Sequence, residues 1–83
     1  MISVFTDDEI EKMAEIEHNR WNWQKRLQGW KYKAGPKDMK NKTNPSLVPW
    51  AQLPDNIKEY DRETVRLIPE LLAKANFEIY KIP

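Results

Sequence analysis

The hydrophobic and polar positions near the N-terminus predict a long helix. Residues 6–9, Thr-Asp-Asp-Glu, form a capping box, in which the threonine and glutamate side chains each accept a hydrogen bond from the other residue's amide. Phe5 and Ile10 flank this box in the positions of a hydrophobic staple. Apolar side chains then recur with a helical period, and Gly29 favours termination. We therefore expect a helix from residue 7 to about residue 28.

The predicted helix carries polar side chains inside its apolar sector. At about 100° per residue, Glu17, Arg20 and Gln24 fall on the apolar half of the helix. The apolar residues of this half are Ile10, Met13, Ala14, Ile16, Trp21, Trp23 and Leu27. The opposite half is polar and holds Glu11, Lys12, Glu15, Asn19, Asn22, Lys25 and Arg26. Because an unpaired buried charge is costly, we expect Glu17 and Arg20 to find partners on the buried side.

Residues 29–60 are predicted to form a long ordered loop, which glycine and proline interrupt repeatedly. Its segment 42–53, Lys-Thr-Asn-Pro-Ser-Leu-Val-Pro-Trp-Ala-Gln-Leu, is too apolar to be left in water and too irregular to be a regular element. We expect this segment to pack on the first helix. Residues 49–53 are typical of one helical turn that begins with proline, and residues 54–60 of another short turn.

A second helix is predicted over residues 62–75. Asp61 is in position to cap its start, and Asn76 is a plausible left-handed stop. Pro69 removes one backbone hydrogen bond, so we expect a kink near Val65.

The last residues predict a short strand. Residues 77–82, Phe-Glu-Ile-Tyr-Lys-Ile, are typical of a strand, and a single strand needs a partner, either residues 1–5 or the same strand of another copy. The predicted fold is thus mainly α, with two main helices, short helical turns in a long ordered loop and a short terminal β element.

The composition indicates one small domain spanning residues 1–83. The sequence contains no cysteine, which excludes a disulfide or a thiolate metal site. It lacks the basic stretch and long apolar run of a signal peptide, and nothing approaches the roughly 20 apolar residues of a membrane span. We therefore expect a cytoplasmic domain without a membrane partner, either complete or cut from a longer chain.

The net charge of +1 conceals a separation of charge along the chain. Residues 1–17 carry six acids and one base, whereas residues 18–42 carry eight bases and one acid. The basic segment favours an anionic partner. Solvated lysines that keep the domain in solution would produce the same pattern. Nucleic acid is disfavoured as a partner, because the overall charge is small and no recognised nucleic-acid motif is present.

The residue types give little support for catalysis. His18 is the only histidine, and neither a second catalytic group nor a set of metal ligands accompanies it at a useful spacing. We expect no enzymatic activity, no metal and no cofactor, and instead a hydrogen bond from His18 to residues 44–50. Glu17 and Arg20 stand one turn apart, so Arg20 is either an internal ion-pair partner, an anion-binding group lining a pocket, or both.

Three motifs resemble the ryanodine receptor (RyR) domain family. They are Glu-His-Asn-Arg-Trp at residues 17–21, Gln-Gly-Trp-Lys-Tyr at residues 28–32 and Asn-Pro-Ser-Leu-Val-Pro-Trp at residues 44–50. The resemblance covers about residues 13–80. It implies a helical domain of the kind that packs as a two-fold tandem pair in the animal channels, an arrangement that a single-copy protein can reproduce as a homodimer. It also implies a sensing or regulatory role, which in prokaryotic relatives has been linked to nucleotide-derived signals.

The resemblance and the residue pattern together predict a recognition module rather than an enzyme. The hypothesis is that it binds a small anionic nucleotide-derived ligand in a sensing, sequestering or regulatory role. The candidate ligand-binding residues are Arg20, Trp30, Tyr32, Lys42, Thr43, Asn44 and Trp50, supported by Glu17, His18 and Trp21. The arginine and lysine would neutralise charge, a tryptophan would stack on a base, and the polar residues would donate or accept hydrogen bonds. The alternative is an assembly module that forms a two-fold homodimer, or docks to partner domains, without a ligand.

Overall fold

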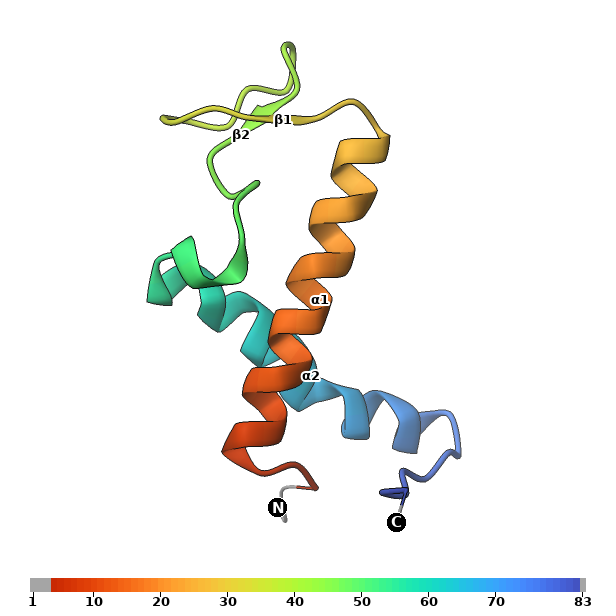
Figure 1. The fold of residues 1–83 in the computed structure, drawn as a ribbon. Coiled ribbons are helices and arrows are strands. Elements are labelled where there is room, and N and C mark those ends of the chain that lie inside the picture. Colours follow the sequence, from red (N-terminus) through yellow and green to blue (C-terminus); the bar gives the residue numbers. More distant parts are fainter. Residues whose placement is uncertain (1–3, 83) are drawn as a thin grey trace.

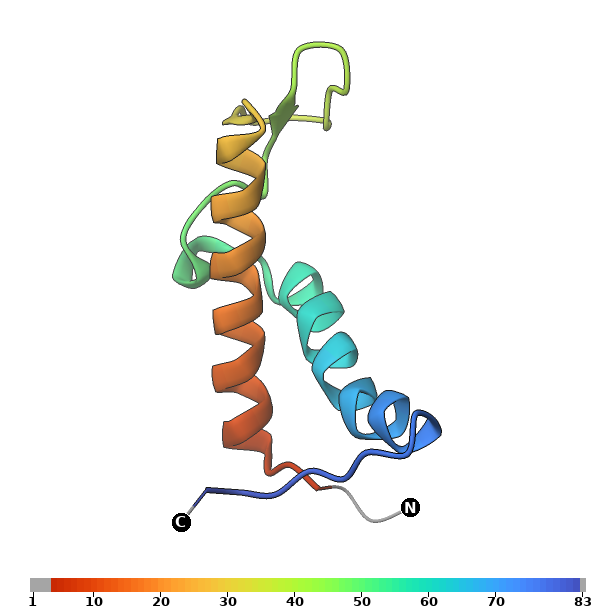
Figure 2. The same cartoon turned by 90° about the vertical axis from the view of Figure 1, so that its right-hand side faces the viewer.

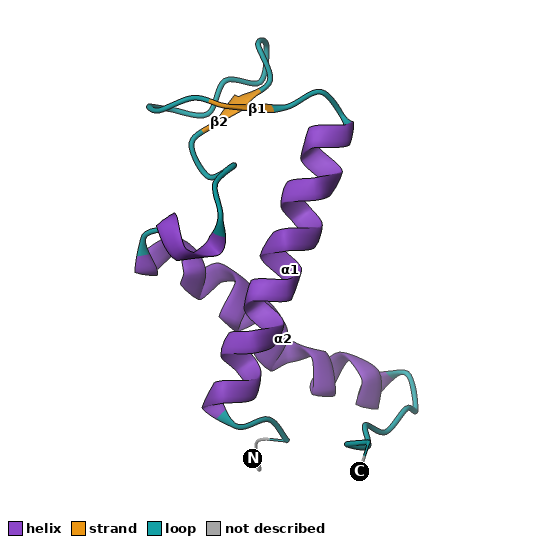
Figure 3. Cartoon of the chain, viewed as in Figure 1, coloured by secondary structure: helices purple, strands orange, loops and turns teal. Residues whose placement is uncertain are grey.

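The computed structural model describes residues 4–82 and is mainly α, as predicted (Figures 1 and 3). The elements in chain order are α1 (Asp7–Leu27), β1 (Lys31–Tyr32), β2 (Thr43–Asn44), the 3₁₀ helix η1 (Trp50–Gln52) and α2 (Asp55–Lys74). The two long helices cross, and the strands lie beyond the C-terminal end of α1 (Figure 1). The described ends of the chain lie together at the opposite end of the molecule (Figure 2).

The predicted start and end of α1 are confirmed. The Thr6 amide donates to the Glu9 carboxylate at 2.9 Å, and the Glu9 amide donates to the Thr6 hydroxyl at 3.2 Å. Beyond Leu27 the chain leaves the helix at Gly29, whose φ of +91° is readily adopted by glycine. Local sequence alone therefore determines where this helix begins and ends.

The buried face of α1 is narrower than predicted. Ile10, Ala14 and His18 are buried, whereas Ile16, Trp23 and Leu27 are exposed, so their assignment to the buried side was wrong. The core contacts of α1 are made with η1 and α2. The buried side chains accordingly stand four residues apart, at positions 10, 14 and 18. The apolar side chains at positions 16, 23 and 27 lie on the same half of the helix but outside this row.

The second helix is longer than predicted. Residues 54–60 do not form a separate turn, and Asp61 is not a cap, because α2 runs without interruption from Asp55 to Lys74. Pro54 precedes the first turn, and no proline or glycine follows before Pro69, which the helix accommodates. Asp61 therefore lies inside the helix. The predicted left-handed stop at Asn76 is confirmed by its φ of 67°.

The predicted terminal strand is wrong. No strand occurs among the described residues 77–82; β1 and β2 pair in parallel instead, Lys31 opposite Thr43 and Tyr32 opposite Asn44. The short β element of the fold therefore lies inside the loop. The tail, residues 77–82, is attached to the start of α1 by an ion pair of 2.8 Å between Lys81 and Glu9. Of the strand partner proposed at residues 1–5, residues 1–3 lie outside the described residues. Side-chain contacts, not a backbone ladder, hold the tail.

The core lies where the two helices and η1 meet. Segment 42–53 packs on α1 as predicted, and it contributes Leu47, Trp50 and Leu53 to the buried residues. The helical turn predicted at residues 49–53 is present as η1. From α2, Val65 reaches the same cluster. An irregular segment thus supplies as much of the core as either helix.

Replacing Leu47 should test how much stability this irregular segment supplies. Leu47 is 1% exposed, so we expect Leu47→Ala to lower the free energy of unfolding by about 2–5 kcal/mol, through lost burial and the cavity left behind. Urea denaturation followed by tryptophan fluorescence measures this change. The matched control is Leu67→Ala on α2, where the side chain is 58% exposed and the change should stay within about 0.5 kcal/mol. Equal losses in both variants would contradict the packing described here.

Candidate functional site

A row of three polar side chains on α1 holds the irregular segment. His18 Nε2 lies 2.7 Å from the Val48 carbonyl oxygen, and Asn22 Nδ2 donates to the same oxygen at 2.9 Å. Arg26 donates from Nη2 to the Leu47 carbonyl at 3.1 Å and from Nε to the Asn22 side-chain oxygen at 2.9 Å. The predicted hydrogen bond from His18 is confirmed. The placement of Asn22 and Arg26 on the outer face was wrong, because irregular backbone carbonyls need donors and these two side chains supply them.

The contacts of His18 fix its orientation. A carbonyl oxygen only accepts, so Nε2 carries a hydrogen and donates it to Val48, while Nδ1 points to the other side of the ring. Nδ1 lies 4.0 Å from Asp61 Oδ2, which is too long for a direct hydrogen bond. The ring is buried and stacks on Trp21, with 5.7 Å between centroids and 26° between planes. His18 therefore binds the irregular segment through one nitrogen and has an acidic group of α2 near the other.

A small pocket opens beside His18 where three distant segments meet. Its volume is about 170 Å³. The lining residues come from α1, from the start of the irregular segment and from α2: His18, Trp21, Asn44, Ser46, Ile57, Tyr60 and Asp61. Three aromatic rings, an amide, two hydroxyls and a carboxyl thus surround a space that holds about five or six water molecules. This combination of apolar walls and a few polar groups is typical of small-molecule sites.

The acidic group of the pocket is electrostatically perturbed. Burial raises the pKa of the Asp61 carboxyl above its ordinary value. The nearby His18 opposes this rise, and the carboxylate of Glu17 adds to it. Because the Asp61 carboxyl lines the pocket, an anion placed inside would be repelled by its ionised form.

The predicted ion pair between Glu17 and Arg20 is confirmed, but its position is different. Arg20 donates from Nε and Nη2 to the two carboxylate oxygens of Glu17, at 2.8 and 2.6 Å, and from Nη1 to Gln24 at 2.6 Å. These bonds lower the pKa of Glu17. The Arg20 side chain is 57% exposed, so the expectation of a buried guanidinium was wrong. Arg20 does not line the pocket at His18.

The other candidate ligand-binding residues gather beyond the end of α1. Trp30 is buried between Lys25 and Lys37, whose ammonium groups each lie 5.4 Å from the ring centroid. Lys42 donates to the Gln28 carbonyl at 3.0 Å and so caps the end of α1. Tyr32 is exposed in β1. These side chains are therefore far along α1 from the pocket, and of the seven candidates only Asn44 lines it, together with the supporting residues His18 and Trp21. Trp50 lies in the core.

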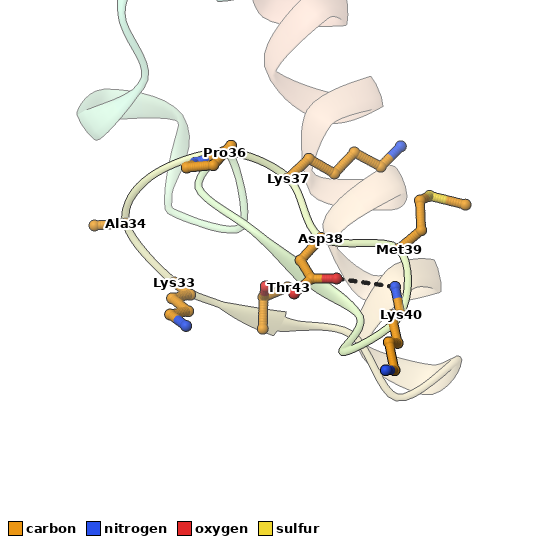
Figure 4. A pocket seen from close by; sticks show the side chains of 8 residues that line it. All are labelled: Lys33, Ala34, Pro36, Lys37, Asp38, Met39, Lys40 and Thr43. Atoms are coloured by element: carbon orange, nitrogen blue, oxygen red, sulfur yellow. Dashed lines mark hydrogen bonds between the residues drawn. The ribbon is translucent and has the colours of Figure 1, made fainter.

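A second hollow lies within loop 33–43 and has a volume of about 400 Å³ (Figure 4). Asp38 shapes this loop by accepting hydrogen bonds from Lys40 and Asn41. The hydroxyl of Thr43 is buried without a hydrogen-bond partner in the described part of the chain. Lys37 extends away from Thr43 in Figure 4, and its ammonium group lies over Trp30 instead. The lysines of this loop thus do not converge on a common point.

Within residues 4–82, no three histidine, cysteine, aspartate or glutamate side chains are grouped to hold a metal ion. No helix in this range combines the length and apolar character that crossing a membrane requires.

A family model of the RyR domain matches residues 2–81. The chain belongs to the RyR domain family. Two of the motifs that suggested this family meet in the structure, because residues 17–21 contain His18 and residues 44–50 contain Val48, which accepts its hydrogen bond. The match also includes α2, so the whole pocket lies within the RyR domain.

Sequence reasoning missed four of the seven residues that line the pocket. Ser46 lies in the motif at residues 44–50 but was not chosen, and Ile57, Tyr60 and Asp61 were not candidates because α2 was predicted to begin only after Asp61. The row of three donors was visible as a spacing of four residues from His18 to Asn22 to Arg26. That spacing places three polar groups on one face of a helix, beside an irregular segment that needs donors.

Neutralising Asp61 should reveal the cost of burying its charge. The raised pKa means that the folded state retains the Asp61 proton to a higher pH than the unfolded state does. The stability that the protonated Asp61 carboxyl contributes is complete below the ordinary pKa of 3.8. It is lost as the pH rises through the pKa of the folded state. We therefore expect Asp61→Asn to raise the unfolding midpoint at pH 7 and to change it little at pH 3, as measured by thermal denaturation.

The control for this experiment is Glu63→Gln, which removes a charge from an exposed position of the same helix. It should change the midpoint little at either pH. If Asp61→Asn lowered the midpoint at pH 7, the attraction between His18 and Asp61 would outweigh the cost of burial, contrary to the expectation.

Proposed function

We propose that this RyR domain is a non-enzymatic recognition module that binds a small nucleotide-derived ligand, with a base ring in the pocket beside His18. The observation that supports this most is the pairing of aromatic walls, Trp21 and Tyr60, with polar groups on Asn44, Ser46 and Asp61. A base offers both a face for stacking and an edge with donors and acceptors, and stacking on an aromatic side chain contributes about 1–3 kcal/mol per base.

The size of the pocket limits which part of the ligand enters it. A volume of about 170 Å³ is smaller than the roughly 300–1,000 Å³ of sites that enclose a whole small molecule. One ring system therefore occupies the pocket, and the sugar and phosphate groups lie outside. Asp61 favours the same orientation, because its carboxylate repels phosphate from the pocket and can accept a hydrogen bond from an exocyclic amine.

The basic part of the chain provides the attraction for the phosphate groups. Residues 18–42 carry eight bases and one acid, and this segment forms the second half of α1 and most of the loop beyond it (Figure 1). A phosphate directed from the pocket toward that end would be attracted by the excess positive charge of this segment, through long-range and therefore salt-sensitive interactions. In this proposal Trp21 and Tyr60 take the stacking role first considered for Trp30 and Trp50.

The proposal includes no catalytic step. The Nε2 hydrogen of His18 is directed at the Val48 carbonyl, and the ring is held between Trp21 and the core. A histidine fixed in this way orients a wall of the pocket. The role that fits best is reversible binding, as in sensing or sequestration.

A binding screen with two matched tyrosine variants tests this proposal. The ligands are adenosine, its mono-, di- and triphosphates, cyclic nucleotides and the guanosine counterparts of these compounds. Isothermal titration calorimetry should detect binding of at least one nucleotide. Tyr60→Ala should weaken that binding about 5- to 150-fold, the equivalent of one stacked ring. Tyr80→Ala removes another exposed tyrosine, outside the pocket, and should leave the affinity unchanged.

Inorganic phosphate and the free nucleosides complete the panel. A nucleotide should bind more tightly than either the nucleoside or inorganic phosphate alone. Raising the salt concentration should weaken the binding of the nucleotide more than the binding of the nucleoside. The proposal fails if no compound binds at millimolar concentration. It also fails if phosphate alone binds as tightly as the nucleotides, because the pocket would then contribute nothing.

A further inference from the structure

A hollow on α1 lies apart from the pocket beside His18 and shares no lining residue with it. Its volume is about 330 Å³. The lining consists of four residues of α1 and the proline that precedes η1: Asn19, Asn22, Trp23, Arg26 and Pro49. The four helical residues are spaced three or four positions apart, which places their side chains along one face of α1. The hollow therefore forms where this face meets the irregular segment.

The guanidinium of Arg26 is held in place beside this hollow. Its Nε donates to the side-chain oxygen of Asn22 at 2.9 Å, and its Nη2 donates to the Leu47 carbonyl at 3.1 Å. Nη1 has no hydrogen-bond partner within residues 4–82. A guanidinium carries five N–H donors, so three remain for a ligand, and such donors bind both oxygens of one carboxylate in pairs. Because the side chain is already ordered, binding costs little additional entropy.

Trp23 gives the same hollow an aromatic wall. Trp23 is 67% exposed, whereas Trp30 and Trp50 are each 8% exposed. It makes no ring or cation–π contact with the described part of the chain, so its ring is available for stacking on a planar group. The amide of Asn19 likewise has no hydrogen-bond partner among the described residues. An open aromatic face, a free amide and an ordered guanidinium thus occupy one face of α1.

The charge around the hollow determines which ligand it suits. Arg26 is the only charged residue of the lining, and no acid occurs between residues 18 and 37. An anion is therefore attracted and a cation is repelled. A single cation balances a single negative charge, so a carboxylate fits better than a phosphate monoester, which carries a charge of about −1.5 to −2.

We propose that this hollow binds a small aromatic carboxylate, whose ring stacks on Trp23 and whose carboxylate accepts hydrogen bonds from Arg26. Side chains three residues apart on a helix are separated by about 5–6 Å at Cβ, so a linker of one or two carbon atoms joins the ring and the carboxylate. Asn19 supplies a further hydrogen bond. The site is open, since every lining residue except Asn22 is exposed. This assignment does not depend on nucleotide binding in the pocket beside His18.

A titration with phenylpropionate, followed by ¹⁵N–¹H NMR, tests this assignment. The four tryptophans give four indole signals, and Trp23→Phe identifies the signal of Trp23 by removing it. We expect this signal to shift saturably, with a dissociation constant of about 1–10 mM for so small a ligand on an open site. The indole signals of Trp30 and Trp50 should move less. Phenylpropanamide lacks the charge and propionate lacks the ring, so each should bind at least about 5-fold more weakly.

Two pairs of variants test the individual contacts. Asn19→Asp places a carboxylate near the guanidinium and leaves the bonds of Arg26 intact, so it should weaken binding by about 5-fold or more. Asn56→Asp makes the same change at an exposed position of α2 and should change the affinity by less than about 2-fold. Trp23→Ala should also weaken binding, as followed through the backbone amide signals. Leu27→Ala alters an exposed apolar residue one turn away, outside the hollow, and should not. The same spectra show whether each variant is folded.

Three results would overturn the proposal. The first is the absence of any saturable shift at about 50 mM phenylpropionate, five times the weakest dissociation constant expected. The second is an equal loss of binding in Asn19→Asp and Asn56→Asp. The third is a shift that is largest at Trp21, which would place the ligand in the pocket beside His18. Tighter binding of phenyl phosphate than of phenylpropionate would contradict the assignment to a carboxylate.

Discussion

The hydrogen bonds from α1 to two backbone carbonyls of the irregular segment determine how this domain is built. Leu47 and Val48 belong to a stretch with prolines on both sides and no ladder to satisfy its polar groups. His18, Asn22 and Arg26 supply the donors. Since these side chains stand on three successive turns, the segment is held alongside the helix. This position buries Leu47 and brings Trp50 into the core.

The same hydrogen bonds create the pocket. His18 is fixed by Val48 on one side and by stacking on Trp21 on the other, so its second nitrogen is directed toward Asp61 on α2. The pocket exists because a rigid polar group separates the irregular segment from α2 and prevents these elements from closing completely. A well-packed aliphatic residue at position 18 would leave the Val48 carbonyl with one donor fewer.

The parts of the fold that depend on local sequence were predictable, and those that depend on a neighbour were not. The capping box at Thr6 and the left-handed stop at Asn76 need only adjacent residues, and both were correct. The buried face of α1 was assigned too broadly, because periodicity does not show from which direction a loop approaches. Asp61 was assigned as a cap because aspartate favours caps, although an intact first turn at Asp55 allowed the helix to start earlier.

The residues of the candidate site were likewise predictable only where local sequence determines them. His18 and Asn44 were candidates because they lie in recognisable motifs, and both line the pocket. Arg20 and Lys42 were selected for charge, but the structure pairs them with Glu17 and the Gln28 carbonyl. Tyr60 was not considered, since its position depends on how α2 crosses α1. Residue type predicts which chemistry is present, but only the packing of distant segments determines which groups share a site.

Helix α1 thus meets two different demands on the side that packs against the rest of the domain. Its inner face is polar at the positions where an irregular segment needs donors and apolar where α2 packs. Ile16, Trp23 and Leu27 remain exposed, because the irregular segment and α2 pack on the stripe that runs through Ile10, Ala14 and His18.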